Sequence, residues 1–150
     1  MREHRSIPRP ALAAGILALL PFPALLILIW TAPAGASREW FISVFLSYMA
    51  AVLALMGGAY WALATGPYGN ARIAAEWLTG LACLVIAWAG INVPAHLGMT
   101  MLIAAFFLLA LRDVVLAEAE AIPLWFGRMR SYIAAVVIVT AILALVRILT

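Results

Sequence analysis

The chain has 150 residues, of which 68% are hydrophobic and 10% are charged, and it carries a formal net charge of +3. Its mean hydropathy is +1.15, and a soluble domain of this length cannot bury so much apolar surface in one core. The composition therefore excludes a soluble globular protein and predicts an integral membrane protein.

Five segments are long and apolar enough to cross a bilayer, which takes roughly 20 apolar residues in a helix. They cover about residues 10–31, 40–65, 73–91, 93–111 and 132–146. The segments are continuously apolar and lack the alternation of a membrane β-strand. The predicted fold class is therefore all-α, a polytopic membrane bundle of five transmembrane helices that forms a single domain over residues 1–150.

The first segment contains Pro21 and Pro23, which remove backbone donors and predict a kink. The basic start, the apolar run and the small residues 34–36 are also typical of a signal peptide with its cleavage site. Because the apolar run is longer than the usual core of such a peptide, we expect the helix to be retained. Cleavage is the alternative.

The second segment carries a double glycine, Gly57 and Gly58, followed by Tyr60 and Trp61. Small residues recur there at four-residue intervals, at Ala50, Ala54, Gly58 and Ala62. This spacing predicts a face on which another helix backbone comes close, and Gly57 widens the same groove. We expect Tyr60 and Trp61 to anchor the helix at the level of the lipid headgroups, with ligand stacking as the alternative.

The third segment has a comparable stripe of small residues, at Ala75, Thr79, Cys83 and Ala87. We expect the second and third helices to pack against each other through these stripes, with Cys83 acting as a small hydrophobe. Glu76 lies in the first turn, four residues after Arg72, and this spacing predicts an interfacial ion pair rather than a general base. A tight turn at residues 92–94 leads to the fourth helix.

Residues that could support chemistry are sparse. The two histidines, His4 and His96, are expected at opposite ends of the bundle, where they cannot share a metal or a haem, and His96 is expected near the interface. We find no paired buried carboxylates, phosphate-binding glycine loop, zinc motif or activated nucleophile in the sequence. We therefore predict no catalytic, cofactor-binding or metal-binding residue. The absence of such residues from the sequence favours a protein that is not an enzyme, but it does not decide the question.

The longest polar segment covers residues 112–130 and combines an acidic first half with an aromatic and basic second half. We predict that it lies along the cytoplasmic membrane surface, with Arg128 and Arg130 near anionic lipid headgroups. Docking on a partner protein is the alternative.

The orientation is predicted from arginine, because the chain contains no lysine. One side of the predicted bundle collects Arg2, Arg5, Arg9, Arg72, Arg112, Arg128 and Arg130. The other side holds only Arg38 and Arg147. Since basic residues concentrate in cytoplasmic loops, we predict the N-terminus inside and the C-terminus outside.

Four short motifs occur in order along the chain: Leu20-Pro21-Phe22, Gly57-Gly58-x-Tyr60-Trp61, Ala87-Trp88 and Pro123-x-Trp125-Phe126-x-Arg128-x-Arg130. This set resembles the transmembrane protein 69-like family, bacterial and mitochondrial integral-membrane proteins of unknown function. The resemblance implies the bundle architecture and a multi-pass location in the bacterial cytoplasmic (inner) membrane, and it implies no reaction. Tyr60 stands where that family usually has a histidine. The Pro-Ser pair that is usual in the third helix of the family is replaced here around Thr79-Gly80, so no residue role is carried over.

Two functions fit these observations. The first is a non-catalytic accessory, assembly or structural component, which packs faces of small residues against partner helices in the membrane. The second is a small oligomeric transporter or a membrane-embedded enzyme. In either case we expect the lipid bilayer and either a membrane-protein partner or further copies of the chain as partners, and no nucleic acid.

Overall fold

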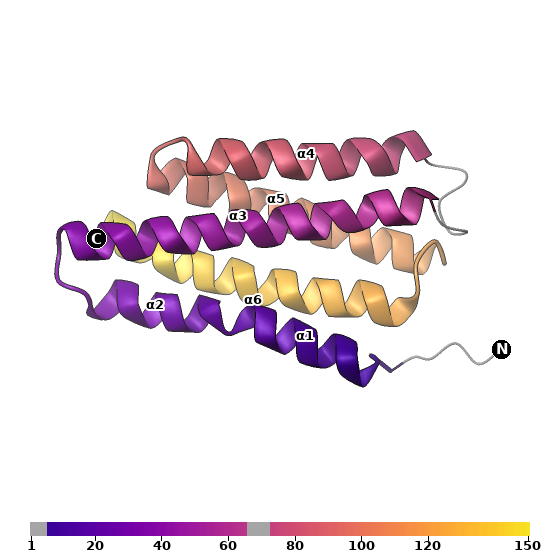
Figure 1. The fold of residues 1–150 in the computed structure, drawn as a ribbon, viewed down its shortest axis with the longest axis horizontal. Helices are drawn as coiled ribbons and strands as arrows, with labels where there is room; N and C mark the ends of the chain where they lie inside the picture. The colour runs from indigo at the N-terminus through magenta and orange to yellow at the C-terminus, as the bar shows by residue number, and fades with distance from the viewer. Residues whose placement is uncertain (1–5, 66–72) are drawn as a thin grey trace.

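The computed structural model describes residues 6–65 and 73–150, and the regular elements of these residues are six α-helices. They are α1 (Arg9–Leu19), α2 (Pro21–Thr31), α3 (Ala36–Thr65), α4 (Ile73–Ile91), α5 (Ala95–Glu118) and α6 (Leu124–Leu149). With α1 and α2 taken together, five spans are long and apolar enough to cross a membrane. They lie side by side along the long axis of the molecule (Figure 1). The predicted all-α bundle of five spans is confirmed.

The first span is interrupted at Leu20, directly before Pro21. Proline has no N–H to donate to the preceding turn, so Pro21 and Pro23 each remove one helical hydrogen bond. Leu20 nevertheless keeps helical dihedral angles, φ −54° and ψ −39°, and the chain therefore bends there instead of forming a loop (Figure 1). This interruption agrees with the predicted kink.

Helices α3 and α4 touch through their backbones. A Cβ atom at Gly57 would overlap the Cβ of Cys83, and one at Gly80 would lie 2.9 Å from the carbonyl oxygen of Gly57. Only glycine at both positions allows this approach. The predicted packing of these two helices is confirmed, and its closest contacts involve Gly57 on α3 with Gly80 and Cys83 on α4.

The predicted role of Gly58 in this contact is wrong. Gly58 is exposed, and apart from its chain neighbours and the backbone of its own helix no atom lies within 4 Å of the position that a Cβ would take. Successive helical residues are rotated by about 100°, so the burial of Gly57 turns Gly58 away from α4. Two other residues of the predicted packing stripes are exposed as well, namely Ala62 on α3 and Ala75 on α4.

Helices α4 and α5 form the expected hairpin, with the turn at residues 92–94. A Cβ at Gly98 would overlap the carbonyl oxygen of Gly90, and Gly90 in turn lies against Leu102. Glycines thus bring the two backbones together directly after the turn, as they do between α3 and α4.

The bounds of the last two helices differ from the predicted ones. α5 continues through Arg112 to Glu118, and α6 begins at Leu124. The expected interfacial segment at 112–130 is therefore mostly helix, with a short connection at residues 119–123 in which Glu120 has φ 55°. The helices can continue through charged residues because several of these residues form ion pairs inside the bundle, as described below.

The interior of the bundle is filled by large apolar side chains. Phe22, Phe45 and Phe106 are fully buried, together with Met49 and Leu53. The ring of Phe22 packs edge-on against that of Phe45, with 5.5 Å between centroids, and so fixes α2 against α3. The outer surface is also apolar, with exposed Leu, Ile, Val, Phe and Trp side chains on all five spans, as expected of helices that face lipid.

A buried polar cluster as candidate functional site

Five polar side chains meet inside one end of the bundle, where α3 and α5 end and α4 and α6 begin (Figure 1). They are Tyr60, Glu76, Arg112, Asp113 and Arg130, which we call the polar cluster. Four of the five are buried, with exposed fractions between 0 and 4%, and Arg112 is partly exposed. Ionisable side chains at such positions in a membrane helix are rare and usually paired.

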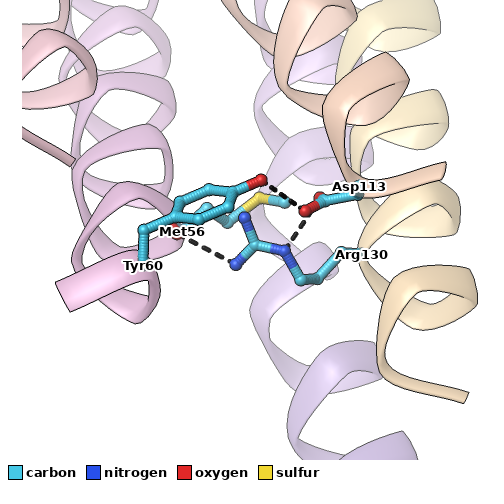
Figure 2. Close-up of polar contacts among 4 residues, drawn as sticks. All are labelled: Met56, Tyr60, Asp113 and Arg130. Carbon is cyan, nitrogen blue, oxygen red and sulfur yellow. Dashed lines mark hydrogen bonds and ion pairs between the residues drawn. The ribbon is translucent and has the colours of Figure 1, made fainter. Parts of the chain in front are cut away.

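Asp113 is the centre of the cluster (Figure 2). The hydroxyl of Tyr60 donates to Asp113 Oδ1 at 2.5 Å, and Arg130 Nε donates to Asp113 Oδ2 at 2.8 Å. Arg130 Nη1 also donates to the carbonyl oxygen of Met56 at 2.9 Å. Both oxygens of one carboxylate are thus engaged, and the bonds join α3, α5 and α6.

A second ion pair connects α4 to the same group. Arg112 Nη2 lies 2.8 Å from Glu76 Oε1. The guanidinium carbons of Arg112 and Arg130 lie 5.1 and 4.9 Å from the centroid of the Tyr60 ring, which is within cation–π range. Tyr60 therefore contacts both ion pairs, one through its ring and the other through its ring and hydroxyl.

Local sequence patterns place these side chains inside. Along α5 the buried positions recur every three or four residues, at Leu102, Ala105, Phe106, Leu109, Asp113, Leu116 and Ala117. On α6, Arg130 is one turn after Gly127, where a Cβ would lie 2.8 Å from the Cβ of Ala117 and 3.3 Å from the carbonyl oxygen of Asp113. The close approach at Gly127 brings the α6 backbone near enough for Arg130 to reach Asp113.

The cluster holds two carboxylates and two guanidinium groups, so its charges cancel. Three of its buried atoms, Glu76 Oε2, Arg112 Nε and Arg130 Nη2, have no hydrogen-bond partner among the described residues. A buried polar atom in that condition costs about 1–3 kcal/mol and commonly binds a water molecule. The cluster can therefore hold four helices in register and has one acceptor and two donors left for a small polar group.

The cluster corrects several predictions. Tyr60 is fully buried and bonded to Asp113, so its ring does not face lipid as an anchoring residue would. Arg130 is 3% exposed and bonded to Asp113, so its predicted headgroup contact is wrong. Arg128 is exposed, and its predicted headgroup contact stays a prediction. Glu76 pairs with Arg112, whereas Arg72, its expected partner, lies outside the described residues.

The other predicted site residues are spread over the bundle. Trp61 stacks on Trp77, with 4.9 Å between ring centroids, and its indole N–H donates to the carbonyl oxygen of Trp77 at 3.1 Å. Trp88 faces outward with 66% of its surface exposed. Pro123 directly precedes α6, and Trp125 packs edge-on against Phe126. Of the motif residues, Tyr60 and Arg130 meet in the polar cluster, and the rest form no common site with them.

Histidine and cysteine have separate surroundings. His96 is exposed and Cys83 is buried, whereas His4 lies outside the described residues. Over residues 6–65 and 73–150, no three His, Cys, Asp or Glu side chains lie close enough together to hold a metal ion.

The five apolar spans and the all-helical fold define a multi-pass membrane protein. A protein family described as "protein of unknown function (DUF3429)" matches residues 7–146, a range that includes the whole polar cluster. The chain belongs to this family. No curated protein and no solved structure matches it. The narrower resemblance to the transmembrane protein 69-like family stays a prediction.

Proposed function

We propose that this protein is a non-catalytic structural or assembly component of a membrane complex in the bacterial cytoplasmic membrane, with its N-terminus inside. The observation that carries the proposal is the outward surface of α3. Six positions of α3 between residues 47 and 62 are exposed. One is Trp61, which stacks on Trp77 of α4, and the others form a row that recurs every three or four residues: Ser47, Ala51, Leu55, Gly58 and Ala62. We call this row the α3 outer face, and all of its members except Leu55 are small.

Small outward-facing residues favour contact with another helix over contact with lipid. Large apolar side chains dominate the exposed surfaces of the other helices, for example Leu108 and Phe107 on α5 and Leu84 on α4. Gly58 loses about 1 kcal/mol of helix propensity relative to Ala, and within the chain no contact at the Cβ position compensates for it. A partner helix that packs on the α3 outer face would supply that contact through close backbone approach.

The polar cluster supports the same function by fixing the orientation of α3. Its hydrogen bonds engage the carbonyl oxygen of Met56 and the hydroxyl of Tyr60, on either side of Gly58 in the sequence. α3 is therefore held against rotation, and the α3 outer face is directed away from the bundle. Each carboxylate of the cluster is paired with an arginine at 2.8 Å, an arrangement suited to holding helices together.

The test is purification of the full-length protein from its native membrane in mild detergent, with companions quantified by mass spectrometry. In Gly58→Leu we expect at least a tenfold loss of stoichiometric membrane-protein companions. The matched control is Ala104→Leu, the same kind of enlargement at an exposed position of α5, and it should retain them. Equal recovery of companions with the two variants would refute the proposal. A complex that contains only this chain would make the α3 outer face a homo-oligomer contact.

One observation favours the second candidate function, a transporter or membrane-embedded enzyme. Glu76 Oε2, Arg112 Nε and Arg130 Nη2 are buried polar atoms without partners among the described residues, and intramembrane ionisable groups often lie on ion or proton pathways. Purified protein in liposomes that contain a pH-sensitive dye tests this function. A proton flux that disappears in Glu76→Gln, while companions remain bound, would replace the accessory function by the second candidate.

A further inference from the structure

A second polar site lies at the end of the bundle opposite the polar cluster. A cavity of about 490 Å³ opens where the connection between α2 and α3, the start of α3, the turn between α4 and α5, and the end of α6 meet. Its polar lining consists of Arg38, Glu39, Ser43, Arg147 and Thr150. We call it the arginine cavity.

Two arginines that lie far apart in the sequence, Arg38 and Arg147, line the cavity together. Arg38 Nε and Nη2 donate to the carbonyl oxygen of Ala32 at 3.2 and 2.9 Å, which fixes this guanidinium group beside the cavity. The guanidinium carbon of Arg147 lies 5.6 Å from the centroid of the Trp30 ring. Both side chains are therefore oriented by the protein before any ligand binds.

Arg147 also has an unused donor. Its Nε atom is buried and has no hydrogen-bond partner within residues 6–65 and 73–150. A buried N–H of a charged group favours an anionic acceptor, and the guanidinium fork matches the oxygens of a phosphate. Glu39 provides the opposite charge on the same cavity wall, so the cavity offers an anion site and a cation site together.

The position of these two arginines is unusual within the chain. The other described arginines, Arg9, Arg112, Arg128 and Arg130, lie at the end of the bundle that holds the polar cluster (Figure 1). A general excess of basic residues on one side of the membrane accounts for those four. That excess does not explain why Arg38 and Arg147 share a cavity at the other end of the bundle. An anionic ligand bound in the cavity would explain it.

We propose that the arginine cavity binds the headgroup of a zwitterionic aminophospholipid, with the phosphate on Arg38 and Arg147 and the ammonium on Glu39. The ends of membrane-spanning helices lie at the level of the headgroups, where guanidinium groups can hold a lipid phosphate through charge-assisted hydrogen bonds. Ile42, Leu46 and Ile91 line the apolar part of the cavity and provide a surface for the start of an acyl chain. The volume is within the range of small-molecule sites.

Native mass spectrometry of the full-length protein in mild detergent tests this site. The probes are dioleoyl-phosphatidylethanolamine, dioleoyl-phosphatidylglycerol with the same acyl chains, and inorganic phosphate. We expect Arg147→Gln and Arg38→Gln each to weaken phosphatidylethanolamine binding about tenfold, the loss associated with one charge-assisted hydrogen bond. Arg9→Gln, which removes the same charge from an exposed position at the start of α1, should leave binding unchanged.

Glu39→Gln tests the ammonium contact. The wild-type protein should prefer phosphatidylethanolamine to phosphatidylglycerol, and Glu39→Gln should abolish that preference while it retains lipid binding. Because Arg38 also holds the backbone at Ala32, its variant can lose structure, and Arg147→Gln then provides the decisive comparison.

Three results would overturn the proposal. The first is equal lipid retention by the wild-type protein and Arg147→Gln, and the second is an equal loss in Arg9→Gln. The third is displacement of the lipid by inorganic phosphate at the same concentration, which would assign the cavity to the free anion.

Discussion

At the scale of single residues, Asp113 is the most deeply buried charged side chain among the described residues. It is 1% exposed and accepts hydrogen bonds from Tyr60 and Arg130, the latter also being buried. Removing one partner of a buried ion pair is strongly destabilising, because the other charge is left without compensation. The stability of the bundle therefore depends on this carboxylate more than on any exposed acidic residue.

We expect Asp113→Asn to lower the free energy of unfolding by about 3–5 kcal/mol, because it leaves the Arg130 guanidinium buried and unpaired. Thermal unfolding of the purified protein, followed by tryptophan fluorescence, measures the effect. Glu118→Gln, at an exposed position at the end of the same helix, is the control and should change little. The double variant Asp113→Asn, Arg130→Gln should recover part of the loss, since neither buried charge remains. A melting temperature of Asp113→Asn equal to that of the control would contradict the structural role of the pair.

At the scale of the helices, the adjacent glycines of α3 allow a matched comparison. Gly57→Ala places a methyl group that overlaps the Cβ of Cys83, whereas Gly58→Ala places it in open space. We expect Gly57→Ala to destabilise the contact between α3 and α4, by about 1–3 kcal/mol as for other overpacked cores. Gly58→Ala should be neutral or stabilise the isolated protein by up to about 1 kcal/mol through helix propensity. The same melting experiment ranks the two, and the reverse order would show that the register of α3 and α4 is wrong.

The helices also show which features could be predicted from sequence. The number of spans and the kink at Pro21 depend on local composition, so the apolar runs and the prolines were sufficient. The packing face of α3 was predicted one residue away from the observed one. Small residues are so frequent in this chain that their spacing fits more than one face, and only the contact of Gly57 with Cys83 distinguishes them.

The polar cluster could not be predicted in the same way. The sequence prediction ends the fourth span at residue 111 and places Arg112 and Asp113 in the polar segment 112–130 along the membrane surface. The residues before Arg112 are apolar on every side of the helix, so the sequence does not mark a buried face, and only the structure shows that this face reaches Asp113 four residues after Leu109. Its partners, however, come from α3 and α6: Tyr60 lies 53 residues away in the sequence and Arg130 lies 17 residues away. Pairing over such separations is a property of the tertiary fold.

At the scale of the whole molecule, the remaining prediction is the orientation in the membrane. Cys83 is the only cysteine and is buried, so a membrane-impermeant thiol reagent should label the wild-type protein weakly. Ala34 and Glu120 are exposed, and they lie in connections at opposite ends of the bundle. A single cysteine placed at either position therefore reports on which side of the membrane that end lies. With the N-terminus inside, intact cells should label Ala34→Cys and protect Glu120→Cys until the membrane is opened. The opposite pattern would reverse the predicted orientation.

The short connection between α5 and α6 also bears on biosynthesis. Asp113 and Arg130 are made within 17 residues of each other, so the ribosome delivers both partners almost together. If α5 and α6 insert as a hairpin, Asp113 and Arg130 enter the lipid as an ion pair. Pairing lowers the free-energy cost of placing a charged side chain in hydrocarbon. Tyr60 and Glu76 emerge earlier and acquire their counterparts only when this last hairpin arrives. Truncation of the nascent chain before Arg130 therefore leaves an incomplete protein that membrane quality-control proteases can recognise.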